Sequence, residues 1–377
     1  MSILKKKDGV FMDSGNKNRH NIIVLCCCIV CVIAVAVCIV VFLSAGKNDS
    51  EAAAKDKVVA GIADKKITES QFKFFARLIL NQEEETVREL YSSVEKSDKD
   101  EIKKYTSNFA NEYLVRVYEA EKAGITLTAD EKASLEKQFE EDYAKNKKTD
   151  EGTLTKEDFY LYYYGISEKK YKEFWTNWYI IDKHTSFLES KADVSEENQQ
   201  LAFIEYYDYL YSYTTSVIPL SVGADDTKEA VKEKAEGIAA QLRSGADFVA
   251  LLKENCTDES LIAKNGVTDF YPAYKEVYSD IYDFVRTSEI GEISVIEAEG
   301  VFYVVRLDGI KDFEKLKGTE EMLKWTRTFY VNKTVSDLLT SEEYKYEIVQ
   351  NVYDGIDLSE LLAEAYKYWE SVWEGNS

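Results

Sequence analysis

Few side chains of this sequence could carry out acid–base, nucleophilic or metal chemistry. The 377 residues include two histidines, His20 and His184, and six cysteines, of which Cys256 alone lies outside residues 22–43. A structural zinc site needs several His or Cys ligands, and a serine or cysteine nucleophile would have to use His184 as its base. Because His184 follows an aromatic helical run, we interpret it as a packed or surface histidine, and Cys256 as structural. We find no phosphate-binding glycine loop and no GxSxG motif, and expect no metal and no cofactor.

Residues 22–43 predict a membrane-spanning helix. These 22 residues carry no charged side chain, and at about 1.5 Å per residue they reach roughly 33 Å, enough for the hydrocarbon core of a bilayer. Residues 1–21 have a net charge of +3, which favours a cytoplasmic basic tail. We therefore expect a single-pass protein of the cell membrane whose bulk is extracytoplasmic, with residues 44–57 as a linker. A cleaved signal peptide is the alternative, but its apolar region is usually shorter.

The charge of the chain excludes some partners and favours others. The formal net charge is −22, so a nucleic-acid partner is not expected. Client chains with basic segments are favoured, and salt should weaken their capture because exposed charges are screened. With one cysteine in the exported part, no intrachain disulfide framework is available and stability must come from packing.

Residues 58–212 predict a mainly helical region. A short strand at Val58–Ala63 precedes a capping box formed by Thr68 and Gln71, which starts a first helix. Further helices are expected up to Gly124, from Thr128, after Gly165 and from Ser195, and their aromatic stripes at helical spacing are expected to be mostly core. The predicted helix from Ser195 carries Leu201, Phe203, Ile204, Tyr207 and Leu210.

Residues 213–312 predict a small α+β domain. Strands are expected at 216–222, 267–271, 293–296 and 301–307, and helices at 226–243, 247–254 and 278–286, which describes a four-stranded sheet with helices. Pro219 lacks a backbone donor and predicts a sheet edge or a bulge in the first strand. Residues 313–377 predict a C-terminal helical segment, part of which joins the helical region. The fold class is therefore α+β.

Several short motifs, in this order and spacing, resemble the exported parvulin-type foldases of the PrsA and SurA group. Gly245–Leu252 reads GADFVALL and is similar to the family's GADFAxLA helix start, Gly291–Ser294 matches its GEIS entry to a hairpin, and 300–307 matches its closing strand. Residues 58–72 and 119–131 are similar to the opening and to a helix joint of the family's helical part. The resemblance covers nearly all of residues 57–360.

The resemblance implies a membrane-anchored folding factor with a helical SurA-like chaperone domain, a parvulin-like domain and unfolded exported proteins as clients. The family's isomerase pocket usually has a histidine on its first and on its last strand. Here residues Ser216–Leu220 of the first strand include no histidine, and the last strand has Phe302 or Tyr303 where the family has its second histidine. We therefore expect a degenerate isomerase. The family's double glycine is also reduced to Asn265–Gly266, so the sequence does not predict whether the family's turn is kept there. The candidate pocket residues, which could line an apolar slot for a proline ring, are Phe270, Tyr271, Phe284, Phe302 and Tyr303.

Three alternatives to this interpretation stay open. The aromatic residues could simply pack the small domain, Tyr303 could supply one hydrogen bond in an active isomerase, or the fold could serve as a surface scaffold or adhesin. The sequence does not decide the oligomeric state.

Overall fold

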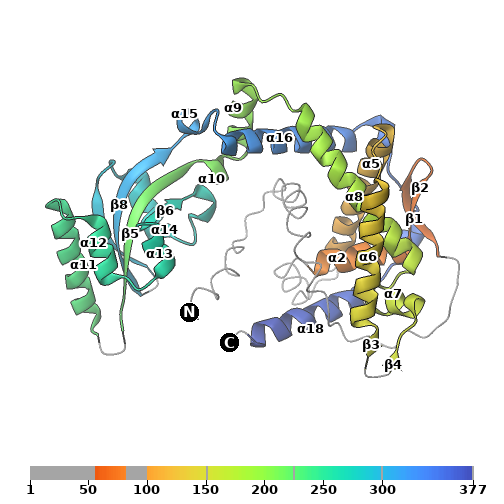
Figure 1. The fold of residues 1–377 in the computed structure, drawn as a ribbon, viewed down its shortest axis with the longest axis horizontal. Coiled ribbons are helices and arrows are strands. Elements are labelled where there is room, and N and C mark those ends of the chain that lie inside the picture. The colour runs from red at the N-terminus through yellow and green to blue at the C-terminus, as the bar shows by residue number, and fades with distance from the viewer. Residues whose placement is uncertain (1–55, 82–99, 150–151, 224–225, 299, 376–377) are drawn as a thin grey trace. The chain divides into compact units, whose positions relative to one another are not determined.

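The computed structural model describes residues 56–81, 100–149, 152–223, 226–298 and 300–375 (Figure 1). The predicted membrane segment 22–43 lies outside these residues. Within them, no helix is both long enough and apolar enough to cross a bilayer. Contacts divide the chain into two compact units: unit 1 runs to Lys191 and resumes at Val331, and unit 2 is Ala192–Tyr330. The domain boundaries predicted from the sequence, at 212/213 and 312/313, differ from these unit boundaries and remain predictions.

Unit 1 is mainly helical, with two small sheets. Its elements in chain order are β1 Val58–Ile62, β2 Lys65–Thr68, α2 Glu69–Leu80, α5 Glu101–Lys122, α6 Ala129–Asn146, β3 Lys148–Thr149, β4 Gly152–Thr153, α7 Lys156–Tyr164, α8 Glu168–Lys191, η2 Glu342–Tyr344, β9 Glu347–Ile348, α17 Gln350–Asp354 and α18 Ser359–Gly375. Helix α16, Glu320–Leu339, begins in unit 2 and ends in unit 1.

The C-terminal residues complete the first part of unit 1. Strand β1 pairs antiparallel with β2 and also with β9, which places Ala60 opposite Ile348. Helix α18 packs on α2, where the Trp369 indole donates a hydrogen bond of 3.1 Å to the Leu80 carbonyl. Arg77 of α2 also pairs with Glu364 at 3.2 Å. Chain segments almost 300 residues apart therefore share one core.

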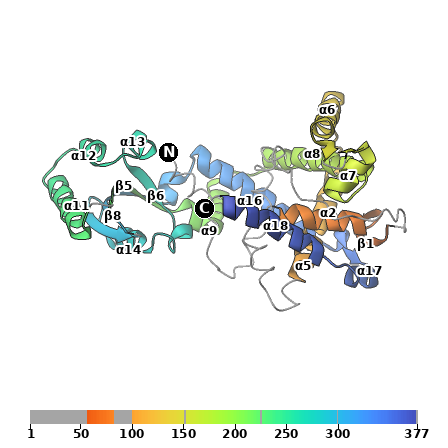
Figure 2. The ribbon, with the colours of Figure 1, turned by 90° about the horizontal axis from the view of Figure 1, so that it is seen from below.

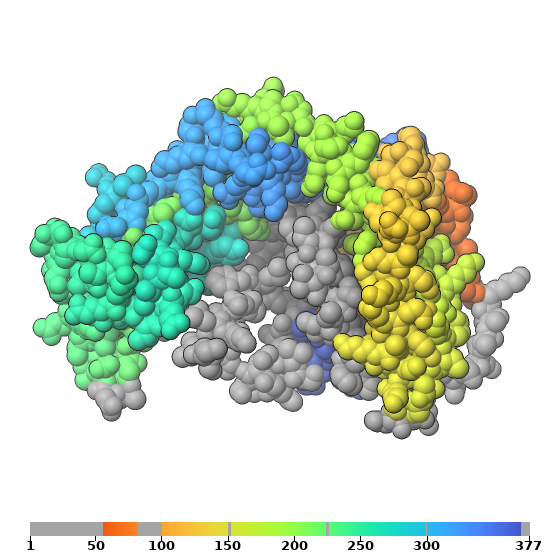
Figure 3. Space-filling view, in the orientation of Figure 1, coloured from red at the N-terminus to blue at the C-terminus, as the bar shows by residue number. Residues whose placement is uncertain are grey.

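The core of unit 1 is built from aromatic side chains of α2, α5 and α8. The Phe74 and Phe174 rings meet edge to face with centroids 5.1 Å apart, and Phe75 meets Tyr113 at 5.3 Å. These geometries are favourable for ring pairs. By contrast, α6 buries little beyond Leu135 and Phe139, and its other side chains stand out as the yellow column in Figure 3. The expectation that aromatic residues at helical spacing are core therefore holds for α2, α5 and α8.

Most predicted helix starts and ends of this unit are found. Gln71 accepts a hydrogen bond from the Thr68 backbone N–H at 3.1 Å, and Glu131 accepts one from Thr128 at 2.7 Å. Gly124 adopts a left-handed conformation with φ of 70° just after α5. The predicted continuous helix from Ser195 is wrong, because it breaks at Tyr206 into two helices of unit 2, α9 Glu196–Glu205 and α10 Tyr207–Leu210.

His184 is buried in α8 beside a buried cationic side chain, Arg116. It is 3% exposed and Arg116 of α5 is 4% exposed, and the His184 Nδ1 atom has no hydrogen-bond partner among the described residues. Burial lowers the pKa of His184, the nearby Arg116 lowers it further, and Glu119 opposes this weakly. Burial and Arg116 therefore favour the neutral form of this histidine when unit 1 is folded.

We expect unit 1 to lose stability as the pH falls through the pKa of an unfolded histidine, 6.5. Below that pH the unfolded chain takes up a proton that the folded chain does not, so the free energy of unfolding decreases. Hydrogen exchange of the α8 amides at about pH 7.5 and about pH 5.5 measures this change. In His184→Gln the pH dependence should be smaller. An equal pH dependence in the two proteins would contradict the assignment.

Unit 2 is organised around a four-stranded antiparallel sheet. After α9 and α10 its elements are β5 Ser212–Ser221, α11 Lys228–Arg243, α12 Phe248–Asn255, α13 Glu259–Ala263, β6 Val267–Phe270, η1 Pro272–Tyr274, α14 Ser279–Thr287, β7 Ile293–Ala298, β8 Val301–Lys311 and α15 Phe313–Leu316. The strand order is β6-β5-β8-β7. The four predicted strands and three predicted helices are all present, and α13 is an additional short helix.

The sheet of unit 2 has an apolar core on each face. Helices α11 and α12 cover one face, packing on Ile218, Leu220, Phe302 and Val304. Helix α14 covers the other face, packing on Val217, Ile296, Val305 and Leu307. Figure 2 shows α12 and α14 on opposite sides of the strands. Because successive side chains of a strand point to opposite faces, this arrangement decides which aromatic residues can meet.

Candidate functional site

The candidate site is the face of the unit 2 sheet that α14 covers, here called the α14 face. Its buried residues come from all four strands and from α14, and they are Val217, Phe270, Ile281, Val285, Ile296, Val305 and Leu307. Helix α14 presents Ile281 and Val285 to the sheet, four residues apart and therefore on one side of the helix. The floor of this face is thus apolar.

Three of the candidate pocket residues lie on the α14 face. Phe270 is buried there, and the half-buried Phe284 and Tyr303 pack against the same cluster. Phe302 does not join them: it is 2% exposed and belongs to the core beneath α11 and α12. The interpretation that Phe302 lines the same slot is therefore wrong, because residues 302 and 303 are neighbours on one strand and point to opposite faces.

The structure adds three tyrosines that the sequence analysis did not select. Tyr213, Tyr278 and Tyr282 also pack on the α14 face. Tyr213 lies directly opposite Phe270 across β5 and β6. The Tyr213 and Tyr282 rings meet edge to face at 5.8 Å, and Phe270 meets Tyr278 at 5.6 Å. The four-residue spacing of Tyr278 and Tyr282 was the available signal, since it places both on one side of a helix.

The described residues of the α14 face offer ring surfaces and hydroxyl groups. Residues 192–330 contain no histidine. Burial and then the neighbouring tyrosines raise the pKa of Tyr282. The remaining candidate, Tyr271, is not among the described residues that pack on this cluster; its ring meets Tyr274 at 6.3 Å, and burial and then the neighbouring Asp269 raise its pKa. These phenols therefore stay protonated near neutral pH. Such a surface can hold an apolar side chain or a proline ring and donate hydrogen bonds.

Pro219 lies on the first strand directly opposite Tyr303 of β8. The Val217 N–H donates to the Gly266 carbonyl at 2.9 Å on the β6 side of the strand. Alternation points the nitrogen of residue 219 the same way, where β6 has no pairing residue. The proline therefore breaks no sheet hydrogen bond, as expected for a local edge. The bulge lies elsewhere, between Thr214 and Thr215.

The turn before β6 is intact although its first glycine is replaced by asparagine. Asn265 has φ of 56° and Gly266 has φ of 79°. Asparagine is one of the few residues that adopt this left-handed conformation readily. The doubt that the sequence raised about this turn is thereby resolved.

The basic side chains of β8 are bound to carboxylates. The Arg306 Nε atom lies 2.5 Å from an Asp308 oxygen, its guanidinium stacks 4.9 Å from the Phe248 ring centroid, and Lys311 pairs with Asp269 at 2.5 Å. Ser216 also donates to Asp308, at 2.5 Å. These groups do not offer a free anion site.

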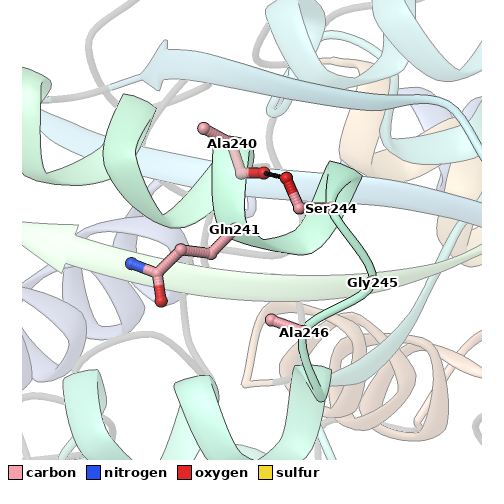
Figure 4. Close-up of a pocket in the computed structure, with 5 residues that line it drawn as sticks. All are labelled: Ala240, Gln241, Ser244, Gly245 and Ala246. Atoms are coloured by element: carbon pink, nitrogen blue, oxygen red, sulfur yellow. Dashed lines mark hydrogen bonds between the residues drawn. The ribbon is translucent and has the colours of Figure 1, made fainter.

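Two other features lie on the side of the sheet that α11 and α12 cover. Cys256 is buried in the core beneath these helices, and its sulfur accepts a hydrogen bond of 3.4 Å from the Asp258 N–H, in keeping with a structural role. A shallow hollow is lined by Ala240, Gln241, Ser244, Gly245 and Ala246 (Figure 4), where the Ser244 hydroxyl donates to the Ala240 carbonyl at 2.9 Å. Since this lining has no titratable side chain, the hollow is not equipped for acid–base chemistry.

Comparison with known proteins assigns this unit to a domain type. Residues 209–311, which run from α10 to the end of β8, match the family described as PPIC-type PPIASE domain. A search of curated proteins finds no match.

Several solved structures are similar over most of the chain. Foldase protein PrsA from Streptococcus pneumoniae is 19% identical, with 83% of this chain and 99% of that chain covered and a TM-score of 0.28. PrsA from Bacillus subtilis is 16% identical, with 81% and 98% covered and a TM-score of 0.26. A SurA-like chaperone of Campylobacter jejuni is 11% identical, with 78% and 99% covered and a TM-score of 0.28. Residues 209–311 of this chain match a PPIC-type domain, in agreement with the parvulin-type foldases that the sequence resembles.

Proposed function

We propose that this chain is a membrane-anchored, extracytoplasmic protein-folding factor of the PrsA and SurA type. The observation that carries the proposal is the PPIC-type match over residues 209–311, together with the aromatic cluster on the α14 face of the same residues. Its clients are unfolded or partly folded exported proteins, and residues 22–43 form the anchor. The apolar composition of that segment and the basic residues before it support the anchoring.

The domain binds proline-containing segments and catalyses their isomerisation weakly. Rotation about an X–Pro bond has a barrier of about 18–20 kcal/mol, which falls when the bond is held twisted in an apolar slot with well-placed hydrogen bonds. Phe270, Phe284 and Tyr303 offer the slot. The two histidines of the resembling family have no counterpart, because residues 192–330 contain none. We propose that the ring of Tyr303, opposite Pro219, binds the proline and that its hydroxyl is not needed for catalysis.

We expect the full-length chain in detergent to accelerate isomerisation of a prolyl peptide roughly five- to 150-fold less than an intact parvulin. Two missing hydrogen bonds of about 0.5–1.5 kcal/mol each contribute about 1–3 kcal/mol in total, and about 1.4 kcal/mol is tenfold in rate. A protease-coupled isomerisation assay measures it. Turnover equal to that of an intact parvulin would reject the degenerate domain.

Tyr303→Phe separates the proposal from an active isomerase that uses a tyrosine. Tyr303 lies on the slot face, which is the observation that favours this second candidate. If its hydroxyl stabilises the twisted amide, the variant should lose most of the measured rate. Under our proposal the small residual rate stays the same.

Client behaviour separates a folding factor from a surface scaffold or adhesin. A folding factor should suppress the aggregation of several unrelated unfolded proteins, and raised salt should weaken this suppression because the chain has a net charge of −22. Binding of one partner only, with no suppression of aggregation, would favour the scaffold.

A further inference from the structure

Aromatic rings form a continuous series from the α14 face to helix α9. Tyr213 contacts Tyr282 at 5.8 Å and Tyr211 at 5.3 Å, and the Tyr211 ring stacks on Tyr207 at 5.0 Å. Tyr207 then meets Phe203 at 5.8 Å. We call these five residues, Phe203, Tyr207, Tyr211, Tyr213 and Tyr282, the aromatic strip. All five belong to unit 2, so the series lies within one compact part of the chain.

One end of the strip is continuous with the candidate slot, and the other reaches solvent. Tyr213 and Tyr282 pack against the same cluster as Phe270 and Tyr303. At the far end the Tyr207 side chain is 42% exposed, and Ile204 and Leu201 on α9 are 63% and 46% exposed. The sequence predicted one continuous helix carrying these residues; in the structure α9 buries Gln199, Ala202 and Phe203, while Leu201 and Ile204 lie on its exposed side. Exposed apolar surface of this kind does not stabilise the core, and it is typical of a binding surface.

The charges beside the strip are acidic. Asp208 is exposed on α10 next to Tyr207, and it helps to raise the pKa of Tyr207 and of Tyr282 after burial and the neighbouring tyrosines. Asp312 also raises the pKa of Tyr211, less than burial, Tyr213 and Tyr207 do. The basic side chain facing Tyr282 is Arg286, which is paired with Asp283 at 2.7 Å. Residues 192–330 as a whole contain 27 Asp and Glu against 14 Lys and Arg.

We propose that the aromatic strip binds an extended, Lys- or Arg-containing segment of the client that flanks the residue held on the α14 face. Tyrosine faces attract cations, and the nearby carboxylates add a favourable potential. The continuity of the rings with the slot places this segment next to the bound proline in the client sequence. The inference rests on the proposed function, and it adds the class of client segment that is preferred.

Three matched peptides test the proposal with the full-length chain in detergent. Each contains one proline, flanked by Lys, by Gln or by Glu, and binding is measured by fluorescence anisotropy at low and at high salt. We expect the Lys peptide to bind roughly three- to tenfold more tightly than the Gln peptide at low salt, the range of a few exposed cation–π and charge contacts. The Glu peptide should bind most weakly.

Two variants test whether the preference for the Lys peptide over the Gln peptide comes from the aromatic strip. Tyr207→Leu keeps apolar area but removes the ring face, and Asp208→Asn removes one charge. Each should reduce the preference for Lys over Gln to about twofold or less. Tyr179→Leu in unit 1, whose tyrosine is 41% exposed, and Glu233→Gln on the exposed side of α11 are the controls and should keep the full preference.

The outcomes separate failure of the strip from failure of the proposed function. The strip proposal is overturned if the Lys and Gln peptides bind equally. It is also overturned if the preference for Lys survives in both Tyr207→Leu and Asp208→Asn. In either case the proposed folding function stands. Loss of the preference in the controls would also overturn the strip proposal, because the effect would then come from overall charge. If no peptide binds and no client is protected from aggregation, the proposed function itself fails.

Discussion

Replacing Phe302 with alanine is expected to destabilise unit 2 by about 3–5 kcal/mol. The ring is 2% exposed and lies beneath α11 and α12 among Ile218, Leu220 and Val304. Its removal loses the transfer free energy of the ring and leaves a cavity that the surrounding side chains fill only in part. Since whole domains are stable by about 5–15 kcal/mol, this single change removes a large share of the stability. Hydrogen exchange of the β5 and β8 amides measures it.

The contrasting variant is Phe284→Ala on the α14 face. Phe284 is half-buried, so we expect its loss to cost about 1–2 kcal/mol of stability and to weaken prolyl peptide binding. Phe302→Ala should leave the affinity of the folded fraction unchanged. The opposite pair of results, with binding lost in Phe302→Ala and kept in Phe284→Ala, would show that the binding face is on the other side of the sheet.

This contrast also shows what the sequence can predict about a site. The order of strands and helices in residues 213–312 and the match to a known family were both readable from local motifs. The sequence did not decide whether Phe302 or Tyr303 faces the slot, because a strand buried on both faces has apolar residues at successive positions and loses its alternation. The pairing of β8 with β5 and β7 fixes that choice.

Helix prediction succeeded where the backbone ends carry a local signal. Thr68, Thr128 and Gly124 mark such ends, and the structure places them as expected. The sequence analysis missed α7. The helix reads KEDFYLYYY, and because five of its last six side chains are aromatic, the sequence shows no helical periodicity. The break at Tyr206 was also not predicted, because no glycine or proline marks it in the sequence.

We expect Gly266→Ala to destabilise unit 2 by about 2–4 kcal/mol. Gly266 has φ of +79°, a conformation that costs alanine about 1 kcal/mol. A Cβ atom there would also lie 2.9 Å from Phe248 Cε1, 3.0 Å from the Val217 carbonyl oxygen and 3.2 Å from Leu252 Cδ2. The aromatic ring could turn aside, but the carbonyl belongs to strand β5, and moving it would disturb the 2.9 Å hydrogen bond between Val217 and Gly266.

The matched control for this variant is Gly245→Ala. Gly245 also has a positive φ, of 92°, but a Cβ atom there would meet nothing within 4 Å. This variant therefore carries the backbone cost alone, about 1 kcal/mol, and the difference between the two variants measures the steric part. Equal destabilisation would mean that β5 and α12 yield freely at Gly266. The larger expected loss at Gly266 explains why asparagine could replace the first residue of this turn at position 265 while the second remains glycine.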